Sequence, residues 1–226
     1  MDIPLQFLLR MFVYDIDING VKVKATLAKH DEVVENELSE LKNSLMTTDF
    51  PVVGVDCKFG RNAPIGKDYD GFVPADNEWV PSLLALYVET RCLIIQLDRS
   101  FPSSLARFLN DENICFVGIK IDYHLECLKY HHHSLCKTSK AGDLTRYGVD
   151  IHDFAACVLK DPSLRYCLGL INLGRRIGVE IQEVDETISP PPSDWGAIVF
   201  SKEEVEYTVH DAYNCYLIGK KLLTSL

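Results

Sequence analysis

The sequence predicts an α/β domain in which helices cover a mixed β-sheet. Three observations lead to this prediction: a hairpin signal opens the chain, strand and helix patterns then alternate, and the last part of the chain is helical. The 226 residues are 47% hydrophobic and 25% charged, which is an ordinary globular composition. A chain of this length buries a core without disulfides, so we expect residues 1–226 to form a single domain.

The N-terminal part reads as a hairpin followed by a helix. Asn19 and Gly20 separate strand patterns at 12–17 and 21–27, and Asn-Gly is the strongest short hairpin signal. Residues 31–46 carry a helical apolar stripe behind an acidic first turn. We expect this hairpin and helix, about 11–47, to be an integral part of the domain.

The middle of the chain alternates strands and helices. Residues 51–59 read as a buried strand, and a second hairpin joins 83–87 to 92–97. A helix, a strand and a helix are expected at 103–110, 115–119 and 123–130, and the polar stretch 131–143 is expected to be a surface loop.

The C-terminal part is expected to be mainly helical. Helices are predicted at 153–159 and 168–177, and three prolines at 190–192 mark a rigid connector. Ser201 and Glu204 have the spacing of a capping box, which opens a final helix that runs to about residue 223.

Charge and cysteine content restrict the class of protein. A formal net charge of −10 argues against a protein that coats duplex DNA without specificity, although a local acidic site for metal-dependent chemistry remains compatible with it. The eight cysteines include no C-x-x-C pair, and most lie in apolar runs, so we expect buried free thiols. Neither a secretory signal nor a membrane span fits the sequence, and we expect an intracellular protein of the cytoplasm or nucleus.

Candidate site residues come from a strand and a helix. Asp56 lies near the end of the buried strand, and Lys58 shares its face because side chains alternate in a strand. Tyr207 and Asp211 are four residues apart in the final helix and so share one helix face.

Together these segments resemble the DnaQ-like 3′–5′ exonucleases of the DEDD class with a tyrosine, and specifically the plant members related to the Werner exonuclease domain. The resemblance covers about residues 51–223. It is carried by 52–56, 91–97, 102–109, 116–119, 150–155, Trp195 and 207–213.

The resemblance implies a ribonuclease H-like fold, with a central five-stranded mixed sheet and helices on both faces. It also implies a site where four carboxylates hold two divalent ions, Mg²⁺ or Mn²⁺. Asp56 and Asp211 match metal-ligating acids of the family, and Tyr207 matches the tyrosine that orients the attacking water.

Two positions depart from the family pattern. Lys58 stands where the family has a glutamate, and His124 aligns with an aspartate, although Asp122 and Glu126 lie nearby and could substitute. An ammonium at position 58 should weaken metal binding. Lys58 could pair with Asp56 and Asp211, face the solvent, or contact a substrate phosphate.

Two functions follow from this pattern. The first is a 3′–5′ exonuclease acting on single-stranded nucleic acid, RNA rather than DNA, through a weakened or rearranged metal site. The second is an inactive pseudo-exonuclease that binds nucleic acid or serves as a regulatory or oligomerisation partner. The resemblance implies a homo-oligomer, with a hexamer as the candidate form and a neighbouring subunit as a candidate contributor to the site. Trp195 is expected to be a packing anchor or a base-stacking platform, and the histidines at 131–133 are not expected to bind metal.

Overall fold

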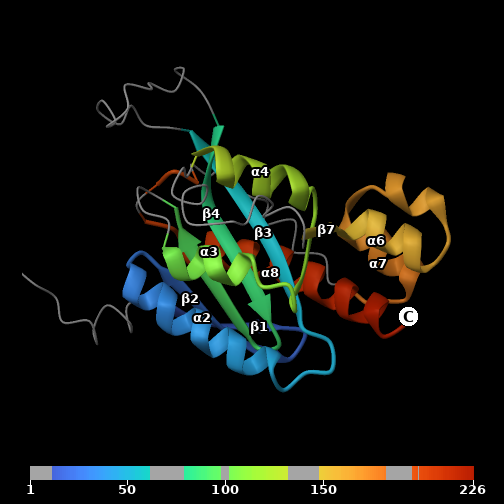
Figure 1. Cartoon of the computed structure of the whole chain (residues 1–226), viewed down its shortest axis with the longest axis horizontal. Coiled ribbons are helices and arrows are strands. Elements are labelled where there is room, and N and C mark those ends of the chain that lie inside the picture. The colour runs from blue at the N-terminus through green and yellow to red at the C-terminus, as the bar shows by residue number, and fades with distance from the viewer. Residues whose placement is uncertain (1–11, 62–78, 98–101, 132–147, 182–194, 198) are drawn as a thin grey trace, which may run out of the picture.

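The computed structural model describes residues 12–61, 79–97, 102–131, 148–181, 195–197 and 199–226. These residues form a seven-stranded mixed sheet in the order β1-β2-β5-β4-β3-β6-β7, with helices on both faces (Figure 1). The strands are β1 (Val13–Ile18), β2 (Val21–Ala28), β3 (Val52–Arg61), β4 (Trp79–Val88), β5 (Arg91–Gln96), β6 (Cys115–Gly118) and β7 (Gly148–Asp150). The helices are α2 (Asp31–Leu45), α3 (Ser103–Leu109), α4 (Ile121–His131), α6 (Ile151–Val158), the 3₁₀-helix η2 (Pro162–Tyr166), α7 (Gly169–Ile177) and α8 (Lys202–Leu223).

The N-terminal hairpin extends one edge of this sheet. Asn19 and Gly20 both have positive φ, and the Gly20 N–H donates to Asp17 Oδ1 at 2.8 Å. Strand β2 then pairs in parallel with β5, where Lys24 lies opposite Arg91. The predicted count of five strands is therefore wrong. The hairpin adds strands at one edge, and β7, which has three residues and is too short to show a pattern, pairs with β6 at the other edge.

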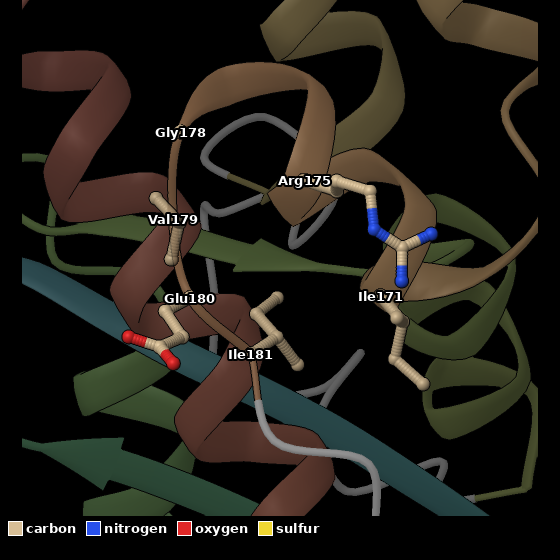
Figure 2. A pocket seen from close by; sticks show the side chains of 6 residues that line it. All are labelled: Ile171, Arg175, Gly178, Val179, Glu180 and Ile181. Carbon is tan, nitrogen blue, oxygen red and sulfur yellow. The ribbon is translucent and has the colours of Figure 1, made fainter.

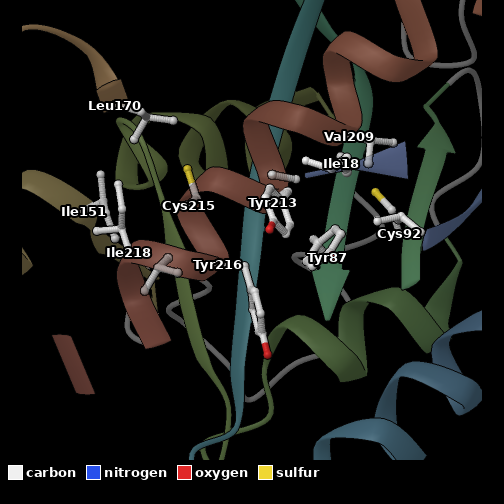
Figure 3. Packing of buried hydrophobic residues seen from close by; sticks show 14 of the residues in the cluster. Ile18, Tyr87, Cys92, Ile151, Leu170, Val209, Tyr213, Cys215, Tyr216 and Ile218 are labelled. Carbon is white, nitrogen blue, oxygen red and sulfur yellow. The ribbon is translucent and has the colours of Figure 1, made fainter. Parts of the chain in front are cut away.

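Two hydrophobic clusters lie on the two faces of the sheet. Because side chains alternate along β3, Val53 and Val55 join the cluster under α2, α3 and α4. Val52 joins the cluster formed with α6, α7 and α8. In that second cluster Tyr87 packs edge-to-face on Tyr213, with ring centroids 5.2 Å apart (Figure 3).

Polar caps set several helix ends. The predicted capping box of α8 is confirmed: the Glu204 N–H donates to Ser201 Oγ, and the Ser201 N–H donates to Glu204 Oε2. Asp150 caps α6 by accepting from the His152 N–H at 2.8 Å, so this helix begins two residues earlier than expected. The predicted loop at 131–143 begins one residue too early, because His131 is the last residue of α4; the rest of this loop and the connector at 189–193 lie outside the described residues.

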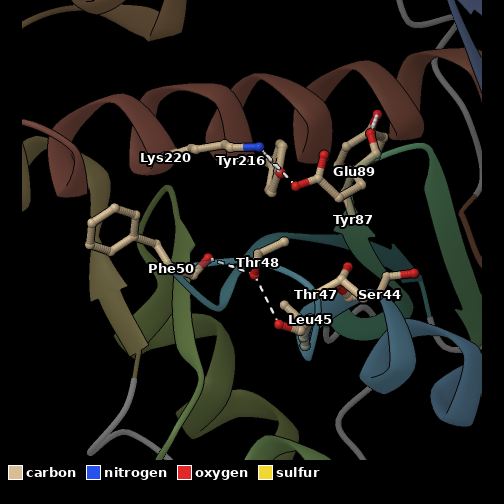
Figure 4. A network of polar contacts seen from close by, with 9 residues as sticks. All are labelled: Ser44, Leu45, Thr47, Thr48, Phe50, Tyr87, Glu89, Tyr216 and Lys220. Carbon is tan, nitrogen blue, oxygen red and sulfur yellow. Dashed lines mark hydrogen bonds and ion pairs between the residues drawn. The ribbon is translucent and has the colours of Figure 1, made fainter.

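A polar network ties α8 to the turn between β4 and β5 (Figure 4). Lys220 Nζ donates to Glu89 Oε1 at 2.8 Å and to the Tyr216 hydroxyl at 3.0 Å. The Tyr87 hydroxyl donates to the Glu89 carbonyl. The last turns of α8 are thus fixed to the same strands that carry the hydrophobic core.

The seven cysteines that the structure describes are free, as expected. Cys57, Cys92 and Cys215 are buried, whereas Cys157 is exposed. Among the described helices, none has both the length and the apolar character needed to cross a bilayer.

Candidate functional site

Close packing of α8 against β3 brings the predicted site residues together. A Cβ atom on Gly54 would lie 2.1 Å from the Ala212 carbonyl oxygen and 2.7 Å from the Tyr216 nitrogen, so only glycine permits this approach. Asp56 is two residues beyond Gly54 on the same face of β3, and Asp211 directly precedes Ala212. The approach therefore places Asp211 beside the end of β3.

Lys58 Nζ contacts both candidate metal-ligating acids. It lies 2.5 Å from Asp211 Oδ2, to which it donates a hydrogen bond, and 2.9 Å from Asp56 Oδ2. The contact with Asp56 is a close ion pair. The side chains of Lys58, Asp56 and Asp211 are only 11%, 16% and 27% exposed, so the three charges are largely removed from water. The predicted site thus contains one ammonium and two carboxylates.

Two aromatic rings complete the surroundings of the ammonium. Lys58 Nζ lies 4.4 Å from the centroid of the Tyr207 ring and 5.6 Å from that of Trp195. The two rings stack with centroids 6.3 Å apart and an interplanar angle of 27°. At these distances ring faces attract a cation.

The position of Trp195 is set by its own segment. The Gln96 side-chain amide donates to the Ala197 carbonyl at 2.9 Å. A Cβ atom on Gly60 would lie 2.3 Å from the Gly196 nitrogen, so the backbone at 195–197 runs directly over the end of β3. Trp195 is therefore a packing anchor in this structure. No sequence pattern indicated the contact of Trp195 with Lys58, although a glycine at a strand end, such as Gly60, is typical of close backbone approach.

The electrostatics follow from burial and from the paired charges. Burial alone would lower the pKa of Lys58, but Asp56 and Asp211 outweigh it and hold that pKa well above its usual value. Burial and the charge of Asp56 raise the pKa of Asp211, and Lys58 opposes this only in part. Burial and Asp211 raise the pKa of Tyr207, so its hydroxyl stays neutral at pH 7. The ammonium is a permanent cation of the site under physiological conditions.

His124 lies at the side of this cluster. Its ring is 5.4 Å from that of Phe59, which directly follows Lys58. Burial lowers the pKa of His124, with Asp56 opposing and Lys58 reinforcing the shift. The imidazole is therefore neutral at pH 7, and the charges of Asp56 and Lys58 affect its pKa.

Asp122 and Glu126, the candidate substitutes, are exposed and share another face of α4. Partial burial and the charges of Asp150, Asp153 and Glu126 raise the pKa of Asp122. Asp122 therefore lies toward α6. Of the histidines at 131–133, the last two fall outside the described residues.

The residues present do not fit a two-metal site of the family type. Within the described part of the chain, no three His, Cys, Asp or Glu side chains are placed to hold one metal ion together. The space against Asp56 and Asp211 that a cation would take is filled by the Lys58 ammonium. A hard divalent ion needs about six oxygen ligands, and here it would have to take most of them from water, where Lys58 and the rings of Tyr207 and Trp195 now lie.

A separate pocket lies at the C-terminal end of α7 (Figure 2). Its charged lining residues, Arg175 and Glu180, extend in different directions, and the other lining residues are glycine or aliphatic. None of the predicted site residues lines it. The cluster around Lys58 therefore remains the candidate site.

Comparison with solved structures identifies the fold as that of exonuclease domains. The crystal structure of Escherichia coli RNase D, an exoribonuclease involved in structured RNA processing, matches 89% of this chain with 18% identity and a TM-score of 0.60. The Aedes aegypti Nibbler EXO domain matches 94% of this chain and 92% of its own, with 13% identity and a TM-score of 0.61. Brucella melitensis NrnC matches 79% of this chain and 74% of its own at 15% identity, with TM-scores of 0.51–0.52; its structures include one with bound Mg²⁺ and one bound to pGG.

The predicted ribonuclease H-like fold is thus confirmed. The chain spans only 44% of the length of RNase D. No protein-family profile and no curated protein sequence matches the chain. At these identities the likeness establishes the fold, and the chemistry has to be argued from the site.

Proposed function

We propose that this protein is an exonuclease-like protein that binds single-stranded nucleic acid, RNA rather than DNA, without two-metal hydrolysis. The observation that carries the proposal is the Lys58 ammonium against the carboxylates of Asp56 and Asp211. RNA is favoured because RNase D is an exoribonuclease. The Nibbler fold match covers nearly the whole of both chains, so the proposal concerns the nuclease-like domain itself.

Charge explains why a metal ion would not share this site. At about 4 Å and an effective dielectric constant of about 20, each pair of unit charges interacts by roughly 4 kcal/mol. A divalent ion beside the ammonium would meet a repulsion of roughly twice that size. Lys58 cannot relieve this by losing its proton, because the two acids hold its pKa well above the usual value. Metal binding would require the Lys58 side chain to leave its buried position.

An aromatic pair with one exposed ring lies beside the site and supports binding to nucleic acid. The Tyr123 residue is 59% exposed, and its ring stacks on Phe59 with an interplanar angle of 26° and a centroid distance of 6.0 Å. Single-stranded nucleic acids bind such rings by base stacking, at about 1–3 kcal/mol per base. Tyr123 is the side chain we expect a base to contact.

Active hydrolysis is the second candidate function. It is favoured by the placement of Asp56, Tyr207 and Asp211 at one site on an exonuclease fold. In this case Mg²⁺ or Mn²⁺ would bind after Lys58 moves away. Further metal ligands would come from His124, from Asp122 and Glu126, or from a neighbouring subunit. Movement of Lys58 would have to be driven by the substrate.

The remaining expectations stay part of the proposal. We propose that residues 1–226 act as one domain, that the chain is one of the plant members of the exonuclease family, and that it forms a homo-oligomer, with a hexamer as the candidate form. Size-exclusion chromatography with light scattering tests the assembly state.

One experiment separates binding from hydrolysis. Labelled single-stranded RNA is incubated with the protein and Mg²⁺ or Mn²⁺, and both its digestion and its binding at 50 and 200 mM salt are measured. The variants are Asp211→Asn, Tyr123→Ala and, as a matched control at an exposed tyrosine elsewhere, Tyr166→Ala. We expect RNA binding that weakens in Tyr123→Ala but not in Tyr166→Ala, and no digestion. Digestion by the wild type that Asp211→Asn abolishes would establish hydrolysis instead. Absence of RNA binding at both salt concentrations would refute the proposed function.

A further inference from the structure

The ammonium of Lys58 is enclosed by groups of two kinds. Carboxylate oxygens of Asp56 and Asp211 lie 2.9 and 2.5 Å from Nζ, and the faces of Tyr207 and Trp195 lie 4.4 and 5.6 Å from it, measured to the ring centroids. The Lys58 side chain is only 11% exposed. Carboxylates and ring faces both attract an organic cation, and they do so more strongly away from water.

The walls of this enclosure are held by contacts that do not involve Lys58. The contact of Gly54 with Ala212 fixes α8, which carries Tyr207 and Asp211. The hydrogen bond between Gln96 and Ala197 fixes the segment of Trp195. The enclosure is therefore part of the scaffold, and Lys58 occupies it as a ligand would.

We infer that four side chains form a cation-binding cage: Asp56, Asp211, Tyr207 and Trp195. The cage is selective for a primary alkylammonium over divalent metal ions, and in the native protein the side chain of Lys58 fills it. The selectivity follows from the surroundings of the two carboxylates. Mg²⁺ or Mn²⁺ held by two carboxylates has to keep several water ligands, and the ring faces of Tyr207 and Trp195 take the place of such waters, whereas ring faces attract an organic cation. The inference is independent of whether the protein binds nucleic acid.

Removing the natural occupant tests the cage. Lys58→Ala deletes Cγ, Cδ, Cε and Nζ, which n-propylammonium can replace atom for atom. The thermal unfolding midpoint is measured for this variant with n-propylammonium, with neutral 1-propanol and with MnCl₂. We expect Lys58→Ala to unfold at a lower temperature and n-propylammonium to raise its midpoint by about 3 °C or more at saturation. We expect 1-propanol at the same concentration to have no such effect, and MnCl₂ to have a smaller one.

A second lysine in the same protein provides the matched control. Lys220 also pairs with a carboxylate, Glu89 at 2.8 Å, and its Nζ lies 5.4 Å from the centroid of the Tyr216 ring. Its side chain is 42% exposed, so water replaces it when it is removed. We expect Lys220→Ala to show no selective response to n-propylammonium.

Each other outcome overturns the inference in a defined way. If 1-propanol raised the unfolding midpoint of Lys58→Ala as much as n-propylammonium does, the stabilisation would come from filling a cavity and not from binding a cation. A larger response to MnCl₂ would mean that the site is a metal site. No response of a folded Lys58→Ala would mean that the cage does not exist without Lys58.

If Lys58→Ala does not fold, the wild type decides the question. The ¹H–¹⁵N signal of the Lys58 ammonium, assigned by its loss in Lys58→Arg, should be observable because its protons exchange slowly with water. Fast exchange, or a saturable rise of the wild-type unfolding temperature with MnCl₂, would overturn the inference. Neither measurement involves RNA, so failure of the cage and failure of the proposed function are separate results.

Discussion

Substitution of Gly54 by alanine should destabilise the protein and disturb the site at once. The added Cβ would lie 2.1 Å from the Ala212 carbonyl oxygen and 2.7 Å from the Tyr216 nitrogen. Both atoms belong to the backbone of α8, which cannot move aside locally. Overpacking of this kind costs about 1–3 kcal/mol, and a collision with backbone lies at or above the upper end, so we expect a loss of about 3 kcal/mol.

The effect is measured by urea unfolding and by thermal unfolding. For a chain of this size, 1 kcal/mol corresponds to about 2–4 °C, so we expect the midpoint to fall by about 6–12 °C. Because α8 must shift, near-ultraviolet circular dichroism should also report loosening of the stacked Trp195 and Tyr207 rings.

Gly219→Ala, at a glycine of α8 that also packs against the sheet, is the matched control. Its Cβ would meet only side-chain methyl groups of Val117 and Val52, the nearest at 2.7 Å, and these groups can give way more easily than backbone. We expect a smaller loss than for Gly54→Ala. A Gly54→Ala protein within about 1 kcal/mol of wild type would refute the argument that glycine sets the approach of α8 to β3.

Three further predictions address the site and two caps. Lys58→Glu places a third carboxylate at the site, so we expect it to be destabilised without metal and to be stabilised by MnCl₂ far more than wild type, as measured by thermal unfolding. Burial tends to raise the pKa of Asp150, but hydrogen bonds from His152 and the Lys120 N–H lower it to about 2. The ordinary pKa of this carboxyl group is 3.8, so the stabilisation of the fold by ionised Asp150 is complete above about pH 4 and is lost as the pH falls toward 2. Asp150→Asn should lose about 1–2 kcal/mol of unfolding free energy at pH 7 and should lose less further stability than wild type between pH 4 and 2. Ser201→Ala removes the capping box of α8 and should cost about 1 kcal/mol in urea unfolding.

Each of these predictions has a clear contrary result. Equal responses of Lys58→Glu and wild type to MnCl₂ would show that position 58 does not control metal binding. An unchanged acid profile in Asp150→Asn would show that its hydrogen bonds do not stabilise the fold. For the cap, a loss below about 0.3 kcal/mol would show that water satisfies the first turn equally well.

The elements with strong local patterns were predictable from the sequence. The Asn19-Gly20 turn, the apolar stripe of α2 and the capping box at Ser201 each depend on nearby residues, and the structure contains all three. Strand β7 and helix η2 were missed, because three residues carry no periodicity and a 3₁₀ turn held by Asp161 has no apolar stripe. The number of strands was underestimated because the pairing of β2 with β5 joins distant parts of the chain.

The site was predictable only as a set of residue types. Alternation in β3 places Asp56 and Lys58 on one face, and the spacing in α8 places Tyr207 with Asp211. The direction of the Lys58 side chain had three open alternatives, and in the structure it pairs with both acids. That choice depends on how closely α8 approaches β3, which is a tertiary property that no local pattern contains. The contact with Trp195 depends in the same way on the backbone crossing at Gly60.

The buried free cysteines give the protein its own reporters of local opening. Burial, reinforced by the charge of Asp56, raises the pKa of Cys57 on β3 and of Cys215 on α8, so neither thiol reacts until the packing around it opens. Cys157 is exposed and reacts without any opening. Timed alkylation of the wild-type protein, followed by mass spectrometry, would therefore compare how fast the packing around Cys57 and the packing around Cys215 open.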